Sequence, residues 1–169
     1  EGETAIYIKD SEYLIIENVV TDGANLNNVT GSLGLSITDG SKYISIRHSA
    51  AINYPSPPFC ADRMGGVGCW FSSIWSVSAS GSWTAEKDIT NVVFYANSIR
   101  DNGYQAEWET GRHAISIAGG TKSIWVLDNE LTRNAEDGLQ IFWFTDGSHG
   151  QPADGVYIGR NTITDNGEN

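Results

Sequence analysis

The chain has 169 residues, the length of a single domain, and a formal net charge of −11. This acidic balance argues against a nucleic-acid-binding surface and a polybasic membrane patch, and no apolar run is long enough to be a membrane-spanning helix. Hydrophobic residues make up 40% of the chain, enough for a core. The 19 glycines, together with many Asn and Asp residues, point to a fold with many tight turns.

Five similar runs rich in β-branched and aromatic residues recur along the chain. Each run leads to Asn, or to His48 in the second copy, and an apolar residue usually follows two places later. These polar positions are 30, 49, 32 and 32 residues apart, which is a regular repeat with one insertion. The runs span residues 13–20, 43–50, 92–99, 124–131 and 156–163.

A second, shorter run with alternating apolar residues precedes four of the five copies. Alternation with a period of two is typical of a half-buried β-strand, and no stretch has the apolar period of a helix. We therefore expect almost no helix. The insertion falls where the prolines and cysteines gather, and we expect a long loop there, near residues 54–83. The shorter runs span residues 5–8, 34–37, 114–117 and 138–141.

Short strands and turns that recur at a fixed period predict a solenoid, in which successive coils pair strand on strand. An Asn at the same turn of each coil can donate and accept hydrogen bonds along the stack. We expect residues 1–169 to form one all-β solenoid domain of about five coils, either alone or as a section of a longer solenoid. The predicted asparagine ladder consists of Asn18, Asn97, Asn129 and Asn161.

The Val-x-Ile-x-x-Asn-x-Ile pattern of residues 156–163 and the Asn-Gly turns resemble the right-handed parallel β-helix of the pectate-lyase-like superfamily. The resemblance covers nearly the whole chain except residues 54–83. It implies a fold that hosts many activities. Lyases of this fold use an Arg or Lys base with calcium, and the related polygalacturonases use paired aspartates and Gly-His-Gly. Residues 147–150 match only part of the Gly-His-Gly motif. We therefore assign no cofactor and no metal ligands, and calcium binding is left open.

Two cysteines lie in a stretch rich in Pro and Gly, where their spacing suits one small disulfide between Cys60 and Cys69. Two free thiols are the alternative, whereas a zinc site would need more ligands nearby. Asn28-Val29-Thr30 matches a glycosylation acceptor. Together these features predict a secreted, extracellular protein.

One group of charged residues is the best candidate for acid–base chemistry. Aligning residues 114–117 with 138–141 places His113 beside Asp137 and Arg112 beside Glu136 on neighbouring coils. A histidine supported by a carboxylate suits a general base. The alternative is that charged residues at the corners of the coils hold the stack together.

An outward-facing apolar column is predicted next to the inward residues of the repeats. If Val156 and Ile158 point inward, then Tyr157, Trp125 and Val93 point outward. Leu14 and Ile44 extend this column unless the first two copies are registered one residue differently. Either the loop that contains Trp75 covers the column, or the column contacts a protein or a sugar. The candidate binding residues are Trp125, Tyr157, Val93 and Trp108.

These observations favour a secreted, non-catalytic solenoid with a structural or adhesive role. The exposed strand edges expected at both ends suggest end-to-end self-assembly into filaments, and the expected partners are other copies or a polysaccharide rather than nucleic acid. The alternatives are a portion of a polysaccharide lyase or glycoside hydrolase that uses His113, Asp137 and Arg112, or a carbohydrate-binding module.

Overall fold

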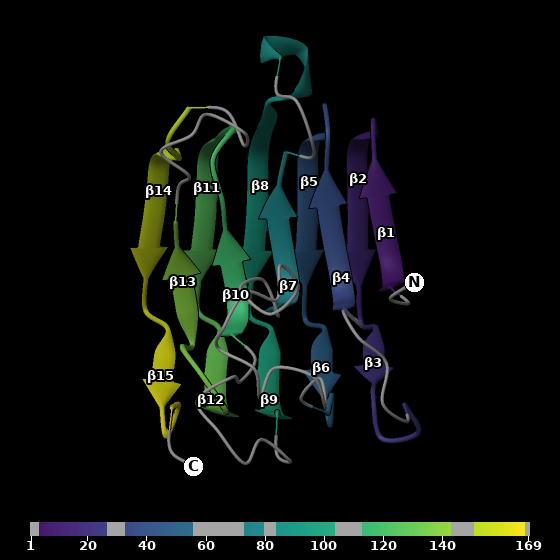
Figure 1. The fold of residues 1–169 in the computed structure, drawn as a ribbon, viewed down its shortest axis with the longest axis vertical. Coiled ribbons are helices and arrows are strands. Elements are labelled where there is room, and N and C mark those ends of the chain that lie inside the picture. Colours follow the sequence, from purple (N-terminus) through teal and green to yellow (C-terminus); the bar gives the residue numbers. More distant parts are fainter. Residues whose placement is uncertain are drawn as a thin grey trace, which may run out of the picture.

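A computed structural model of the chain describes residues 4–26, 33–55, 73–79, 84–103, 113–142 and 151–167. The described residues form three parallel five-stranded sheets, and each sheet takes one strand from each of five successive coils, which we call rungs 1 to 5 (Figure 1). The all-β parallel solenoid of about five rungs is therefore confirmed. Among the described residues, the only helical segment is the short 3-10 turn η1 (Ala85–Lys87), and no helix is long and apolar enough to cross a membrane.

The three sheets follow one another in every rung, so the chain passes from sheet A to sheet B to sheet C and back to sheet A. Sheet A contains β1 (Thr4–Lys9), β4 (Leu33–Thr38), β7 (Ser73–Ser78), β10 (His113–Ile117) and β13 (Leu139–Ile141). Sheet B contains β2 (Glu12–Glu17), β5 (Lys42–Arg47), β8 (Ile89–Tyr95), β11 (Thr121–Leu127) and β14 (Asp154–Gly159). Sheet C contains β3 (Val20–Asp22), β6 (Ala50–Ile52), β9 (Ser98–Asn102), β12 (Glu130–Asn134) and β15 (Thr162–Thr164).

Parallel pairing in register stacks the inward side chains of successive rungs in columns. In sheet B, for example, Ile44, Val92 and Ile124 are aligned and at most 1% exposed. Each such residue loses most of its apolar surface to the rungs on either side, and burial of this kind contributes about 1.5–3 kcal/mol per side chain. The core is therefore continuous along the stack and needs no helix to cover it.

The range predicted as an insertion loop also contains part of the solenoid, which corrects one expectation. Residues 73–78 form β7, the central strand of sheet A, within the predicted loop 54–83. Trp75 of this strand is 2% exposed, and its ring lies 5.7 Å from that of Phe94 in the core. Trp75 therefore packs inside the solenoid and does not cover its outer surface.

The register of the first two rungs corrects a second expectation. Leu14 and Ile44 pair with each other and then with Val92, so they continue an inward column. The outward column that contains Val93, Trp125 and Tyr157 instead continues through Ser45 to Ile15. The alternative register, shifted by one residue in the first two copies, is the one that the structure shows.

An asparagine ladder lines the corner between sheets B and C, but Asn18 is not part of it. The backbone N–H of Asn97 donates to Oδ1 of Asn129 at 3.0 Å, and that of Asn129 donates to Oδ1 of Asn161 at 2.9 Å. The equivalent residue of rung 2 is Ser49, whose Oγ accepts from the N–H of Val19. Asn18 lies one position earlier, with an exposed side chain and a φ of 58°.

A second asparagine ladder, which the repeat pattern did not predict, lines the corner after sheet C. Nδ2 of Asn102 donates to Oδ1 of Asn134 at 2.8 Å, and Nδ2 of Asn134 donates to Oδ1 of Asn166 at 2.9 Å. The backbone N–H of Tyr54 donates to Oδ1 of Asn102. Both ladders satisfy buried turn groups that have no place in the sheets.

Candidate functional site

The outer face of sheet B carries one aromatic side chain in each of the five rungs, and we call this set the aromatic stripe. Every member is at least partly exposed, with fractions of 75% for the rung 1 residue and 54% for the rung 5 residue. The stripe crosses the five strands over about 19 Å, from four rung spacings of about 4.8 Å each. Its members hold three register positions: Trp125 and Tyr157 lie two residues further along the strands than Tyr13 and Tyr43, and Tyr95 lies two residues further again. Its members are Tyr13, Tyr43, Tyr95, Trp125 and Tyr157.

The rings of the stripe lie in two stacked pairs at the two ends of the sheet. The centroids of Tyr13 and Tyr43 are 4.8 Å apart with an interplanar angle of 2°. Trp125 and Tyr157 are 5.4 Å apart with an angle of 10°. These separations exceed direct face-to-face contact, so the rings are offset and part of each face stays open. In the middle rung, Tyr95 contacts the exposed ring of His48 edge-on at 5.6 Å.

The backbone of sheet B explains why the rings can lie outside. One residue in each of its strands has a positive φ, which places a local irregularity at the same height in every rung. Such a residue interrupts strict alternation, so two consecutive residues of the strand face outward, as Lys122 and Ser123 do between the buried Thr121 and Ile124. At Gly155 the absence of a side chain leaves space beside the ring of Tyr157, which lies 3.7 Å from where a Cβ would be. The positive-φ residues are Tyr13, Tyr43, Asn91, Ser123 and Gly155.

Charged and polar columns flank the stripe on both sides. On one side, Glu12 and Lys42 form an ion pair of 3.7 Å, and Lys122 pairs with the nearly buried Asp88. On the other side, Nε of Arg47 lies 3.1 Å from Glu17, at the register position that Tyr95 holds in rung 3. The stripe is thus an apolar surface bordered by hydrogen-bonding groups, the arrangement expected of a surface that recognises a ligand with both apolar and hydroxyl faces.

Arginine–carboxylate pairs link successive rungs at the two corners of sheet C. Arg160 makes two hydrogen bonds, of 2.7 and 2.6 Å, with Asp128 in the preceding rung. Arg133 makes two, of 2.6 and 3.0 Å, with Asp101. Hydrogen bonding to Arg160 lowers the pKa of Asp128, and hydrogen bonding to Arg133 is the largest cause of the lowered pKa of Asp101.

The structure brings together two residues of the candidate acid–base group, His113 and Asp137. Nδ1 of His113 lies 3.3 Å from Asp137, as predicted, and Nε2 of His113 lies 2.9 Å from Glu136. The imidazole is 8% exposed, whereas Asp137 is 64% exposed. Both ring nitrogens face carboxylates of the next rung, so the histidine joins β10 to the turn before β13. These contacts fit the alternative interpretation, in which charged residues at the corners hold the stack together, and the catalytic role of His113 stays a prediction.

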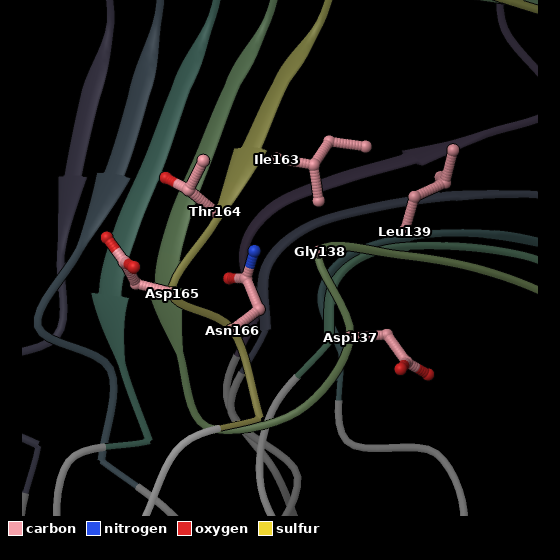
Figure 2. A pocket seen from close by; sticks show the side chains of 7 residues that line it. All are labelled: Asp137, Gly138, Leu139, Ile163, Thr164, Asp165 and Asn166. Atoms are coloured by element: carbon pink, nitrogen blue, oxygen red, sulfur yellow. The ribbon is translucent and has the colours of Figure 1, made fainter.

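An open hollow of about 330 Å³ lies at the outer edge of rung 5, between β13 and β15 (Figure 2). Figure 2 shows the side chains of Leu139 and Ile163 on one side and the carboxylates of Asp137 and Asp165 on opposite flanks. Asn166 of the second ladder also lines the hollow. Leu139 and Ile163 continue inward columns, so the hollow borders the core of rung 5 rather than the outer face of a sheet.

Several predicted residues lie outside the described part of the chain. These are Arg112, Trp108, Cys60 and Cys69, so their predicted roles and the predicted disulfide stay predictions. Within the described ranges, no group of three or more His, Cys, Asp or Glu side chains is arranged to hold a metal ion. The sequence reasoning missed Tyr13, Tyr43 and Tyr95, although each repeat copy contains one outward aromatic residue that could have been noticed.

Comparisons with known proteins add no family assignment. No protein-family model matches the chain, and neither the curated proteins nor the solved structures include a match.

Proposed function

We propose that this chain is a secreted, non-catalytic, adhesive β-solenoid whose sheet B binds a linear, uncharged polysaccharide. The observation that carries the proposal is the aromatic stripe, with one exposed or partly exposed ring in every rung of a parallel sheet. Several exposed aromatic rings gathered on one face of a sheet are uncommon on a surface without a binding role. We propose that the chain is a right-handed β-helix of the pectate-lyase-like superfamily and that this surface binds a repetitive ligand.

The repeat of the solenoid favours a linear ligand laid along the stack axis. Each rung advances by about 4.8 Å, a step comparable to that of one sugar ring in an extended polysaccharide. Sugar rings place an apolar face against an aromatic ring, and their hydroxyl groups can hydrogen-bond to neighbouring side chains such as Ser45, Asn91 and Ser123. A ligand in this direction would contact every rung in turn.

The net charge of the chain favours one class of polysaccharide over another. The formal net charge of the chain is −11, and this field opposes a polyanionic chain such as a polyuronate. The cations that border the stripe, Arg47, Lys42 and Lys122, are paired with carboxylates, so they offer little unpaired positive charge. An uncharged polysaccharide avoids this repulsion, and we propose it as the ligand class.

Adhesion through sheet B accounts for more features of the surface than the end-to-end stacking of copies into filaments does. Stacking rung 1 of one copy on rung 5 of another, in register, aligns apolar residues such as Ile16 and Ile158. It also places Glu12 over Asp154, a like-charge pair that destabilises the contact. We therefore propose that the aromatic stripe, rather than end-to-end stacking of copies, is the adhesive surface.

A binding and turnover assay tests the proposal against its enzymatic alternative. The full chain is titrated with β-linked neutral oligosaccharides of increasing length and with uronate oligosaccharides, with and without calcium, by isothermal calorimetry. We expect affinity that rises with length for a neutral series and no shortening of any sugar on prolonged incubation. Failure of every neutral series to bind would overturn the proposal, and turnover of a uronate oligosaccharide would establish a lyase or hydrolase instead.

A further inference from the structure

The aromatic stripe is interrupted in the middle of sheet B. Asn91 of rung 3 holds the register position that Tyr43 holds in rung 2. Val93, two residues later, holds the position that Trp125 holds in rung 4. The stripe therefore contains two platforms of two stacked rings each, with a gap at rung 3. The first platform is Tyr13 and Tyr43, and the second platform is Trp125 and Tyr157.

The two platforms lie on a line that is oblique to the stack axis. Their centres are three rung spacings apart, about 14 Å, and two residues apart along the strands, about 7 Å, which places them about 16 Å apart at about 25° to the axis. The line crosses β8 at Val92, between the partly exposed side chains of Asn91 and Val93. Tyr95 lies three residues beyond this crossing, about 10 Å along the strand, so its ring is off the line.

The line runs along a band of sheet B that carries no charge. The outward residues at the register positions of Tyr13 and Ile15 are uncharged in all five rungs. Charged side chains hold the next outward positions on both sides, such as Lys42 on one and Arg47 on the other, and these two pair with carboxylates. A neutral chain laid on the line therefore meets no charge and leaves the bordering ion pairs intact.

Hydroxyl groups lie on both sides of the line. In rung 2, Ser45 follows the ring of Tyr43 by two residues. In rung 4 the order is reversed, and Ser123 precedes the ring of Trp125 by two residues. The two serines are thus on opposite sides of the line. A sugar ring has an apolar face and a rim of hydroxyl groups, so a chain on this line finds rings beneath it and hydroxyl partners at either side.

We infer that sheet B holds one neutral polysaccharide chain obliquely across both platforms, and that the gap sets the shortest ligand that binds with full affinity. This inference rests on the proposed function and adds to it a path and a length requirement. The oblique path lengthens the step between rungs from about 4.8 to about 5.3 Å, still comparable to one sugar ring. A disaccharide therefore reaches one platform only, whereas five sugars reach from Tyr13 to Tyr157. A ligand that bridges both platforms makes its second contact intramolecularly, which raises the affinity about 100-fold or more over one platform.

A length series tests this requirement. Cello-, xylo- and manno-oligosaccharides of two to six units are titrated with the full chain by isothermal calorimetry. For a series that binds, we expect affinity to rise at least 100-fold between two and five units and less than threefold between five and six. A single compact site would instead reach its full affinity at two or three units.

Three variants test the path. Tyr43→Asn introduces the residue type that rung 3 carries at the same position, and Asn91 shares the left-handed backbone, with φ values of 54° and 58°. Trp125→Val likewise introduces the residue type of Val93. Tyr95→Leu is the matched control, because it removes an exposed ring of sheet B that lies off the line. We expect the first two variants to bind the five-unit ligand at least tenfold more weakly and the control to bind it within twofold of the native chain.

The disaccharide distinguishes bridging from a general loss of binding. Each platform variant keeps the other platform, so we expect its affinity for the disaccharide to stay within threefold of the native value. Far-UV circular dichroism checks folding, and Tyr157→Val replaces Trp125→Val if that variant does not fold.

The outcomes separate this inference from the proposed function. Equal affinity for two and five units, a platform variant that binds the five-unit ligand as the native chain does, or an equal loss in Tyr95→Leu would overturn the path and leave the proposed polysaccharide binding standing. A platform variant that loses the disaccharide as strongly as the five-unit ligand would also overturn it. Failure of every neutral series to bind would overturn both.

Discussion

Oδ1 of Asn129 accepts hydrogen bonds from both the backbone N–H and the Nδ2 of Asn97, each at 3.0 Å. Nδ2 of Asn129 in turn donates to the carbonyl oxygens of Phe94 and Leu127. One amide therefore joins the turn of its own rung to the turn and strand of the preceding rung. Because Asn129 is 2% exposed, water cannot replace these bonds.

Replacing Asn129 by Asp tests the ladder. The change removes the Nδ2 donor and buries a charge, and we expect the free energy of unfolding to fall by about 3 kcal/mol. Asn18→Asp is the matched control, because Asn18 is exposed, lies outside the ladder and has a left-handed conformation that Asp tolerates. Urea unfolding at pH 7 should show a loss below about 0.5 kcal/mol for this control. Equal losses in the two variants would contradict the assignment of the ladder.

Replacing Tyr157 by Ala tests the aromatic stripe. The variant loses the ring stacked on Trp125, and we expect affinity for the bound neutral oligosaccharide to fall about tenfold, which corresponds to about 1.4 kcal/mol. Tyr7→Ala is the matched control, because Tyr7 is also a half-exposed tyrosine of a terminal rung, at 59% against 54%, but points outward from sheet A. Isothermal calorimetry should find the control unchanged. An equal loss in both variants would place the ligand elsewhere.

Replacing Asp101 by Asn tests the arginine pairs through their pH dependence. The pKa of Asp101 lies below its usual 3.8, mainly through its hydrogen bonds with Arg133. A lowered carboxylate pKa stabilises the fold above the unfolded value, and this stability is lost as the pH falls through the folded value. We expect Asp101→Asn to be less stable than the native chain at pH 7, by about 0.5 kcal/mol, and equally stable near pH 2.

The control for this comparison is Asp154→Asn. Asp154 is exposed and has no ion pair among the described residues, so its replacement should leave the pH dependence of stability unchanged. Thermal unfolding followed between pH 2 and pH 7 measures all three proteins. A stability difference between Asp101→Asn and the native chain that persists at pH 2 would contradict the role given to the ion pair.

Replacing His113 by Asn tests whether this histidine is structural. The variant loses the contacts with Glu136 and Asp137 in a nearly buried site, and we expect unfolding to require about 2 kcal/mol less. His48→Asn is the matched control, because His48 is exposed and its left-handed backbone suits Asn. Oligosaccharide affinity should be the same in native and His113→Asn proteins. Loss of a measurable turnover in His113→Asn would instead indicate catalysis.

The sequence predicts the rungs well because the inward residues of sheets A and B alternate over at least three positions. Runs such as 114–117 and 156–163 carry this alternation and become β10, β14 and β15. The strands of sheet C are shorter, often three residues, and a run of that length cannot display a period. The third sheet therefore became visible only through the pairing of strands such as β12 and β15.

Two errors have local physical causes. β7 follows a stretch rich in Pro and Gly, which predicts a loop. The alternating Ser-Ile-Trp-Ser-Val-Ser pattern of β7 predicts a strand only when it is considered apart from that stretch. The repeat pattern wrongly places Asn18 in the ladder because Asn is favoured both at a ladder position and at the left-handed residue directly before it. The five-residue spacing of Asn129 and Asn134, repeated in Asn97 and Asn102, would have revealed the second ladder.

The parallel stacking of the rungs also bears on how the molecule opens. A strand in rung 3, such as β8, has a paired neighbour on each side, whereas β2 and β14 have one. Stability in such a linear array is a sum over adjacent units, so local opening begins at the two termini of the array and moves inward. Backbone amides of β8 would then exchange with deuterated solvent last. Unfolding would proceed rung by rung from the two ends rather than in a single cooperative step.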